Sequence, residues 1–185
     1  LFYFRKYMGS RTAIGNGQLY LQTGNFMAEM NLPDSALHYY QLSMDADPRI
    51  IQPALNAGVL LMKSESYGEA LIYLQQAVKR DPQHFSSLYN LGLVYHALNR
   101  YDSAIQYISL AIQQEPSRAD TYYQLACTYA LAGQKPQAML CLRQALERGF
   151  KNKESLLTDP DLEELKGEKE FQSLLDKYLP DRKLP

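Results

Sequence analysis

The sequence has no tryptophan, only two cysteines, no long apolar run and no extended run of one charge. Its formal net charge is −1, and no basic run is longer than Arg5-Lys6. Because nucleic-acid affinity depends on neutralising many phosphates, this charge pattern argues against a nucleic-acid partner. No stretch approaches the length of a membrane-spanning helix, so we expect no direct membrane insertion by this chain.

What the sequence does contain is a 34-residue pattern that occurs four times without interruption, over residues 17–50, 51–84, 85–118 and 119–152. Four of its positions hold small residues or proline. The eighth holds Gly24, Gly58, Gly92 and Ala126; the twentieth holds Ala36, Ala70, Ala104 and Ala138; the twenty-seventh holds Ser43, Ala77, Ala111 and Ala145; the thirty-second holds Pro48, Pro82, Pro116 and Phe150. A period of this length indicates a solenoid of stacked repeats.

Each repeat has two stretches of helix length joined by a short turn. In the third repeat, apolar residues recur at spacings of three and four over Ser86–Leu98 and again over Tyr101–Gln114. Nothing in the chain alternates at strand period over a useful length. Glycine inside a helix costs about 1 kcal/mol relative to alanine, so the glycine column predicts close approach of paired helices. The proline column predicts helix ends, because a residue before proline is pushed out of the α region.

The pattern resembles the tetratricopeptide repeat over residues 17 to about 150. The first copy departs from it with Met27 where an aromatic is common, and the fourth with Phe150 in place of proline. Terminal repeats are expected to be atypical. The resemblance implies an all-α, right-handed α-solenoid of four helix pairs.

The two flanks do not continue the pattern. Residues 1–16 are expected to form an N-terminal extension that could be the remainder of a longer chain, and Gly15–Gly17 to form a turn leading into the first helix. Residues 153–185 are predicted to form a helical cap and tail. The string from Gly149 through Asp159-Pro160-Asp161 to Phe171 resembles a closing segment of bacterial multidomain and envelope proteins, which would cover the last repeat.

Groups able to do chemistry are scattered. The three histidines occupy unrelated positions in three repeats, without the short ligand spacing of zinc sites, so no metal or cofactor is predicted. Cys127 and His96 could face the same groove, yet no orienting group or oxyanion donor is readable, and no enzyme is predicted. The acidic group at 159–164 lacks calcium-loop spacing and suits helix starts instead. No disulfide is expected between Cys127 and Cys141, whose positions point to different faces.

The family resemblance implies a concave groove lined by the first helix of each repeat. Its predicted peptide-binding residues are rich in amides and aromatics: Asn25, Asn56, Val59, Met62, Tyr89, Asn90, Leu93, His96, Tyr123, Gln124 and Cys127. Such a lining suits an extended peptide, since tyrosine gives rigid contact area and amides can bond a peptide backbone. Alternatively, Asn56 and Asn90 simply follow the repeat's common choice. A clamp for acidic chaperone tails is not expected, because Leu21 and Ser86 stand where basic residues belong.

The sequence thus predicts a non-catalytic scaffold that binds a peptide or helix of another protein in its concave groove. The alternative is a structural or self-association domain of a larger envelope or signalling protein. The partner's identity stays open, as does the compartment, cytoplasmic or bacterial envelope-associated.

Overall fold

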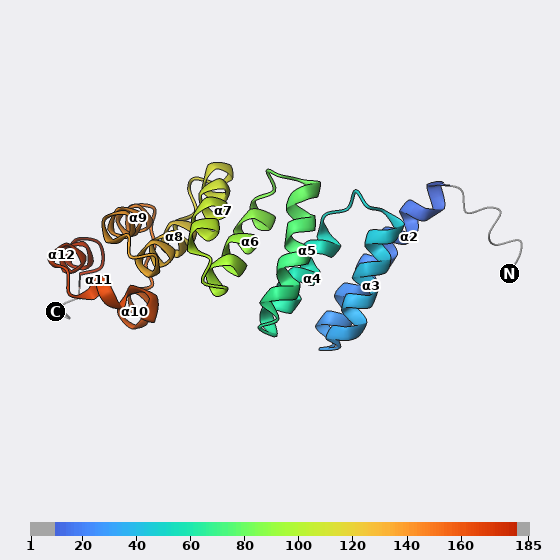
Figure 1. The fold of residues 1–185 in the computed structure, drawn as a ribbon, viewed down its shortest axis with the longest axis horizontal. Coiled ribbons are helices and arrows are strands. Elements are labelled where there is room, and N and C mark those ends of the chain that lie inside the picture. Colours follow the sequence, from blue (N-terminus) through green and yellow to red (C-terminus); the bar gives the residue numbers. More distant parts are fainter. Residues whose placement is uncertain (1–9, 181–185) are drawn as a thin grey trace, which may run out of the picture. The chain divides into compact units, whose positions relative to one another are not determined.

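The computed structural model describes residues 10–180, so part of the predicted N-terminal extension and the last residues of the tail lie outside the described part. Those residues fold into helices and turns, without a strand between residues 10 and 180. Within each unit, helices that follow one another run antiparallel in pairs (Figure 1). None of the helices in this range has the length and apolar character needed to cross a membrane.

The chain divides into two compact units, and the boundary between them falls after Val94, within one helix. The first unit contains α2 (Ser10–Glu29), α3 (Pro33–Ala46), α4 (Gln52–Lys63), α5 (Tyr67–Arg80) and most of α6 (Phe85–Ala97). The second contains the end of α6, then α7 (Tyr101–Gln114), α8 (Ala119–Leu131), α9 (Lys135–Glu147), α10 (Lys153–Thr158), the 3-10 turn η1 (Pro160–Leu162), α11 (Glu163–Lys166) and α12 (Lys169–Tyr178). The two helices predicted for the third repeat are present as α6 and α7.

Small residues let the paired helices approach closely, as the columns of the repeat predict. A methyl group added at Gly58 of α4 would stand 2.5 Å from Cγ of Leu74 on α5. At Gly24 of α2 it would stand 2.6 Å from the ring of Tyr40 on α3. Leu74 and Tyr40 hold the same position in their repeats, so one large side chain fills the space over one glycine in each pair.

Helix ends also follow the prediction from the prolines. Helices α3, α5 and α7 each stop one residue before an acidic residue that precedes proline. Asp47 and Asp81 are extended, with φ/ψ of −142°/94° and −138°/99°, as expected before proline.

The turn inside each helix pair uses a left-handed residue at a fixed position of the repeat. Asn31, Glu65, Asn99 and Gly133 have φ between 57° and 72°. Glycine and asparagine tolerate this region readily, whereas glutamate does so at a cost. The turn is therefore defined by backbone geometry more than by one residue type.

The turn predicted at Gly15–Gly17 is wrong, because these residues lie inside α2, which begins at Ser10. This part of α2 contacts α3, because the buried hydroxyl of Ser43 donates a 2.7 Å hydrogen bond to the carbonyl oxygen of Gly17. The N-terminal part of α2 is thus fastened to α3 by a contact that the local sequence does not reveal.

The predicted cap is helical, as expected from its apolar spacing. Its core residues Leu156, Leu162, Leu165 and Phe171 are fully buried. Helix α12 packs on α9, and η1 packs on α8. Arg143 of α9 also pairs with Glu170 of α12. The cap therefore covers the last helix pair, which lacks a following repeat.

Candidate functional site

In the first unit, a hydrogen-bonded network joins three helices at the predicted groove positions Asn25 and Asn56. The Nδ2 group of Asn56 on α4 donates to Oδ1 of Asn25 on α2 at 2.8 Å. The Tyr40 hydroxyl on α3 donates to the same oxygen at 3.0 Å. Burial raises the pKa of Tyr40, so its hydroxyl remains a donor at neutral pH. These bonds fix the two amides and use one of the two N–H groups of Asn56.

A hollow of about 250 Å³ opens beside this network. Apolar side chains form much of it, with the two asparagines of α4 and α6 and one lysine at its edge: Ala28, Tyr40, Leu55, Asn56, Val59, Leu60, Lys63 and Asn90. Asn90 is held by its own helix, because its Nδ2 group donates to the Ser86 carbonyl oxygen at 2.7 Å. In such an arrangement the apolar surface can bind a side chain of a peptide, while the oriented amides can form hydrogen bonds with the peptide backbone.

The other predicted groove residues of the first unit, Met62, Tyr89 and Leu93, are half-buried and lie outside the lining of this hollow. The Tyr89 ring stacks on Phe85 with centroids 5.7 Å apart. Among the predicted residues of this unit, the hollow thus brings together Asn56, Val59 and Asn90, with Asn25 bonded behind them.

In the second unit, the predicted groove positions contact the chain's own cap. The Tyr123 hydroxyl donates to Oδ2 of Asp159 at 2.5 Å, and the Tyr123 ring stacks on Phe150 at 4.3 Å. His96 Nε2 lies 3.0 Å from Oδ2 of Asp161. We call residues 159–161 the closing turn. It occupies the surface that Tyr123 and His96 were predicted to offer a ligand, while Gln124 is half-buried nearby on α8.

Burial dominates the electrostatics of this contact. It raises the pKa of Tyr123, and the hydrogen bond to Asp159 raises it further. Burial also raises the pKa of Asp161, an effect that the nearby His96 opposes. A carboxyl group with a raised pKa destabilises the folded state while ionised, and this cost disappears as the pH falls through that pKa. The closing turn is held by the hydrogen bond of Tyr123 to Asp159, by the stacking of Tyr123 on Phe150, and by the contact of His96 with Asp161.

The residues of the hypothetical cysteine–histidine pair do not form one. His96 Nδ1 lies 3.0 Å from the Thr128 hydroxyl, and its Nε2 faces Asp161, so both ring nitrogens are engaged elsewhere. Burial first, then the negative charges of Asp159 and Asp161, raise the pKa of Cys127. A thiol in this environment is a poor nucleophile.

The same three residues, Cys127, Asp159 and Asp161, place ligand-type atoms within 4.8 Å of one another. These atoms already have partners in the chain. Asp159 caps the amide of Asp161 with Oδ1 at 2.9 Å and accepts from Tyr123 with Oδ2. The role of these carboxylates in fastening the closing turn accounts for the cluster, and we assign no metal to it.

Both cysteines are free thiols and are buried, and we expect them to resist alkylation in the folded protein. Burial raises the pKa of Cys141 to about 11, from 9.0, which lowers its thiolate fraction about 100-fold. Mass spectrometry after brief iodoacetamide treatment should show little modification unless denaturant is added. Asp159→Asn removes a negative charge beside Cys127 and should accelerate the labelling of Cys127 alone. Equal labelling of Cys127 in folded and unfolded protein would contradict the contact.

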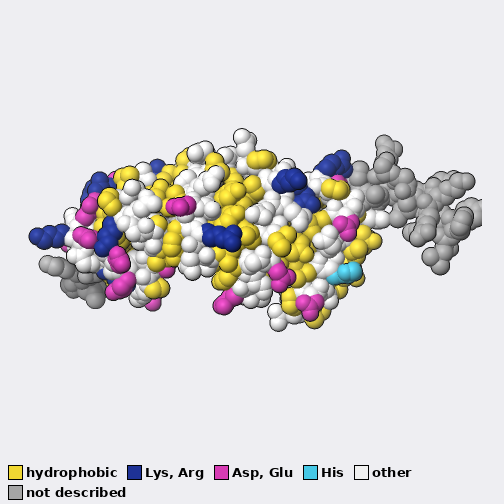
Figure 2. All heavy atoms as spheres, in the orientation of Figure 1, with side chains coloured by type: hydrophobic (Ala, Val, Ile, Leu, Met, Phe, Trp, Pro, Cys, Tyr) yellow, Lys and Arg dark blue, Asp and Glu magenta, His cyan; other side chains and the backbone are white. Residues whose placement is uncertain are grey.

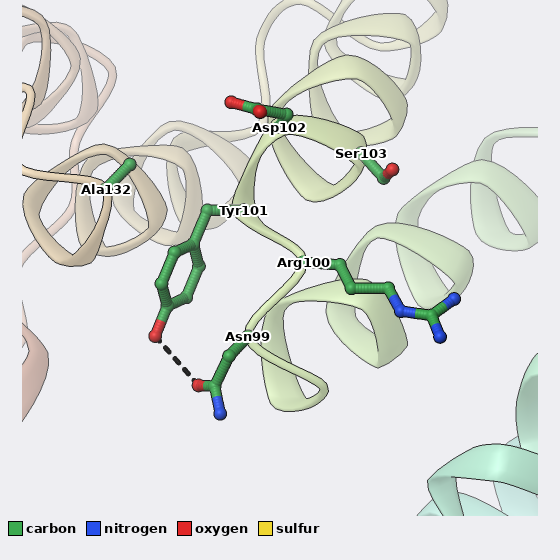
Figure 3. Close-up of a pocket in the computed structure, with 6 residues that line it drawn as sticks. All are labelled: Asn99, Arg100, Tyr101, Asp102, Ser103 and Ala132. Atoms are coloured by element: carbon green, nitrogen blue, oxygen red, sulfur yellow. Dashed lines mark hydrogen bonds between the residues drawn. The ribbon is translucent and has the colours of Figure 1, made fainter.

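A second hollow, of about 360 Å³, lies at the turn between α6 and α7. Figure 3 shows that its side chains diverge: Tyr101 donates to Asn99 at 2.8 Å, whereas Arg100 points away from both. No convergent set of polar groups forms among the residues drawn, so this hollow carries no site.

The sequence did not reveal the residues that form hydrogen bonds with the predicted groove residues. Tyr40 is assigned to core packing by its position in the repeat, yet its hydroxyl reaches Asn25. Thr128, Asp159 and Asp161 contact residues 32 or more positions away. Contacts between residues so far apart in the sequence cannot be predicted from a single sequence. Only the local spacing of Asp159 and Asp161 is visible there.

Tandem antiparallel helix pairs, joined through small residues and closed by a helical cap, define the class of all-α repeat solenoids. Models of the tetratricopeptide repeat match residues 55–119 and 119–148, together about half of the chain. The chain belongs to the tetratricopeptide-repeat family.

Solved structures with this fold are similar along most of the chain. YrrB, described as a tetratricopeptide-repeat protein with an unusual peptide-binding site, superposes with a TM-score of 0.71 at 18% identity, over 88% of this chain and 86% of its own. A MamA fragment from Desulfovibrio magneticus RS-1 gives 0.68 at 21% identity, over 72% and 76%. A further MamA structure gives 0.68 at 20% identity, over 92% and 97%. At these identities the likeness concerns the fold. No curated protein matches the sequence.

Proposed function

We propose that this chain is a non-catalytic scaffold that binds an extended peptide or a helix of another protein. The observation that carries the proposal is the fixed amide network of Asn25 and Asn56 beside the apolar hollow. Network bonds orient the Asn56 amide before any ligand arrives, which lowers the entropy cost of binding. The family, and the unusual peptide-binding site of YrrB, support the same class of partner.

In this proposal the peptide binds across the hollow of the first unit. An apolar side chain of the ligand would enter between Leu55 and Val59, and the amides of Asn56 and Asn90 would bond its backbone. The closing turn takes the corresponding surface of the second unit, through Tyr123 and His96. We therefore place ligand contacts at the first-unit members of the predicted groove.

A displayed library of random peptides, selected against the intact chain, tests this proposal. The double variant Asn56→Ala, Asn90→Ala should bind the selected peptides about tenfold more weakly, because each lost hydrogen bond is worth about 0.5–1.5 kcal/mol. Fluorescence anisotropy measures the dissociation constants, and circular dichroism checks that the helices persist. Ile72→Ala is the matched control, since Ile72 is exposed on α5 and is absent from the hollow. Peptides that bind both variants equally would refute the assigned surface.

A further inference from the structure

The contact between α6 and the closing turn belongs to a chain of hydrogen-bonding groups that ends inside α8. Nε2 of His96 lies 3.0 Å from Oδ2 of Asp161, and Nδ1 of the same ring lies 3.0 Å from Oγ1 of Thr128. The Thr128 hydroxyl donates to the carbonyl oxygen of Gln124 at 2.8 Å. Thr128 is fully buried and the His96 side chain is 15% exposed, so water has little access to this chain.

The hydrogen atoms available to these groups limit their protonation state. A hydroxyl group has one hydrogen atom, and that of Thr128 is given to Gln124, so the Thr128 oxygen accepts from His96. Nδ1 of His96 then carries a hydrogen atom. A neutral imidazole has only one N–H, so Nε2 of a neutral ring is an acceptor. Nε2 and the ionised carboxylate of Asp161 would be two acceptors 3.0 Å apart, and they need a proton between them.

Without that proton, one hydrogen bond of the chain is lost. A neutral His96 whose Nε2–H donates to ionised Asp161 has no hydrogen atom on Nδ1, which must accept from Thr128. The Thr128 hydroxyl then turns away from Gln124, and that hydrogen bond is absent. All three contacts form together only when His96 and Asp161 hold one proton more than a neutral ring and an ionised carboxylate.

The surroundings of the contact favour this proton. Burial raises the pKa of Asp161, His96 opposes this effect, and the negative charge of Asp159 adds to it. The other titratable groups that face the contact among the described residues are uncharged at neutral pH: Tyr123 and Cys127 of α8, and Tyr101 of α7. The charged side chains of α11 have partners of their own, in the pairs Glu163–Lys166 and Glu164–Lys135.

Surface charge does not bias the contact strongly. Figure 2 shows acidic and basic side chains intermixed over the C-terminal helices on the face that it displays. The groups in direct contact with His96 and Asp161 therefore decide where the proton lies.

We propose that the closing turn is a proton-dependent latch. A proton taken up from solvent and held between His96 and Asp161 fastens the turn to α6 and α8, and loss of this proton at higher pH loosens it. The turn lies on Tyr123 and His96, so the latch controls the cover over two predicted groove positions. A folded state that binds more protons than the unfolded chain loses stability as the pH rises. The stability that the proton contributes is therefore present at lower pH and lost as the pH rises through the pKa of the pair.

Nitrogen-15 NMR of the imidazole rings in the intact chain tests where the hydrogen atoms lie. His38, which is exposed on α3, is the reference ring, and the variant His96→Gln identifies the His96 signals by their loss. At a pH where His38 is neutral, Nδ1 of His96 should still carry a hydrogen atom. The second proton should lie on Nε2 or on the Asp161 carboxyl, whose carbon-13 shift reports it. A neutral His96 at that pH, with Nδ1 bare and Asp161 ionised, would overturn the proposal.

Urea titrations followed by circular dichroism, between about pH 5 and 8, measure the consequence for stability. EDTA is present throughout, so that no metal ion takes the place of the proton. Over this range the unfolding equilibrium constant of the wild type should rise about two- to tenfold relative to that of Asp161→Asn, because one hydrogen bond is lost. Thr128→Val, which removes the hydroxyl with little change of shape, should flatten the pH profile in the same way.

Asp176→Asn is the matched control, since Asp176 is exposed on α12, and it should keep the pH profile of the wild type. A side chain that only supports the fold would lower stability by the same factor at every pH, so the profile separates the latch from a purely structural contact. Parallel profiles for the wild type and Asp161→Asn would overturn the latch, as would a wild type that gains stability over Asp161→Asn when the pH rises.

Discussion

Phe171→Ala is expected to lower the free energy of unfolding by about 3–5 kcal/mol, because it removes a fully buried aromatic ring and leaves a cavity. Phe171 lies on α12, which packs on α9 and covers the last helix pair. Urea titration followed by circular dichroism measures the loss. In a repeat protein each helix pair depends chiefly on its neighbours, so the damage should begin locally.

Hydrogen exchange locates that damage. Amides of α9 and α12 should lose protection in Phe171→Ala, while those of α4 and α5 in the first unit change little. Gln172→Ala is the matched control, since Gln172 is exposed on the same helix, and surface changes of this kind usually stay within about 0.5 kcal/mol. A cost for Phe171→Ala no larger than that of Gln172→Ala would contradict the role of this ring in the cap.

Leu74→Ala is expected to cost about 2–5 kcal/mol, because Leu74 is fully buried over Gly58. The same contact makes the effect of Gly58→Ala depend on its partner. In the wild type the added methyl would stand 2.5 Å from Leu74 Cγ, so the substitution should destabilise the protein through overpacking. In the Leu74→Ala background that clash is gone, and alanine should stabilise the helix by about 1 kcal/mol.

A double-mutant cycle from urea titrations measures this reversal of sign as a coupling energy between positions 58 and 74. Gly68→Ala provides the control, since a methyl group there meets nothing within 4 Å and should have the same effect in both backgrounds. Equal effects of Gly58→Ala in the two backgrounds would show that the glycine column does not serve helix contact.

The parts of the fold that repeat could be predicted, because the same position carries a similar residue in several repeats and so reveals its structural role. Gly24 and Gly58 share one position, and the large residues over them, Tyr40 and Leu74, share another, so the helix contact is visible in the columns. The ends of α3, α5 and α7 could be predicted for the same reason, because a proline recurs at one position of the repeat. The beginning of α2 was not predicted, since Gly15 and Gly17 favour a turn in the local sequence and the contact of Gly17 with Ser43 joins residues 26 positions apart.

The candidate site was predictable only where it follows the repeat. Asn56 and Asn90 hold equivalent positions and line the same hollow. The hydrogen bonds that orient them are not visible in the repeat pattern, because they join different positions of different repeats. One example is the bond from the Tyr40 hydroxyl to Asn25. In the second unit the segment from Gly149 to Phe171 was expected to cover the last repeat, and Asp159 and Asp161 were expected at helix starts. Their hydrogen bonds with Tyr123 and His96 were not predicted. These bonds join residues far apart in sequence and occur once.

The contacts of the closing turn limit where a single repeat can be added to this array without loss. The closing turn touches His96 of α6 and Tyr123 of α8, so it recognises two successive repeats at once. A single repeat inserted between α9 and the cap would separate the turn from His96 and Tyr123, and it would separate α12 from α9, on which α12 packs. The last two repeats and the cap are therefore expected to be kept together when the number of repeats changes, because the hydrogen bonds of the closing turn join all three.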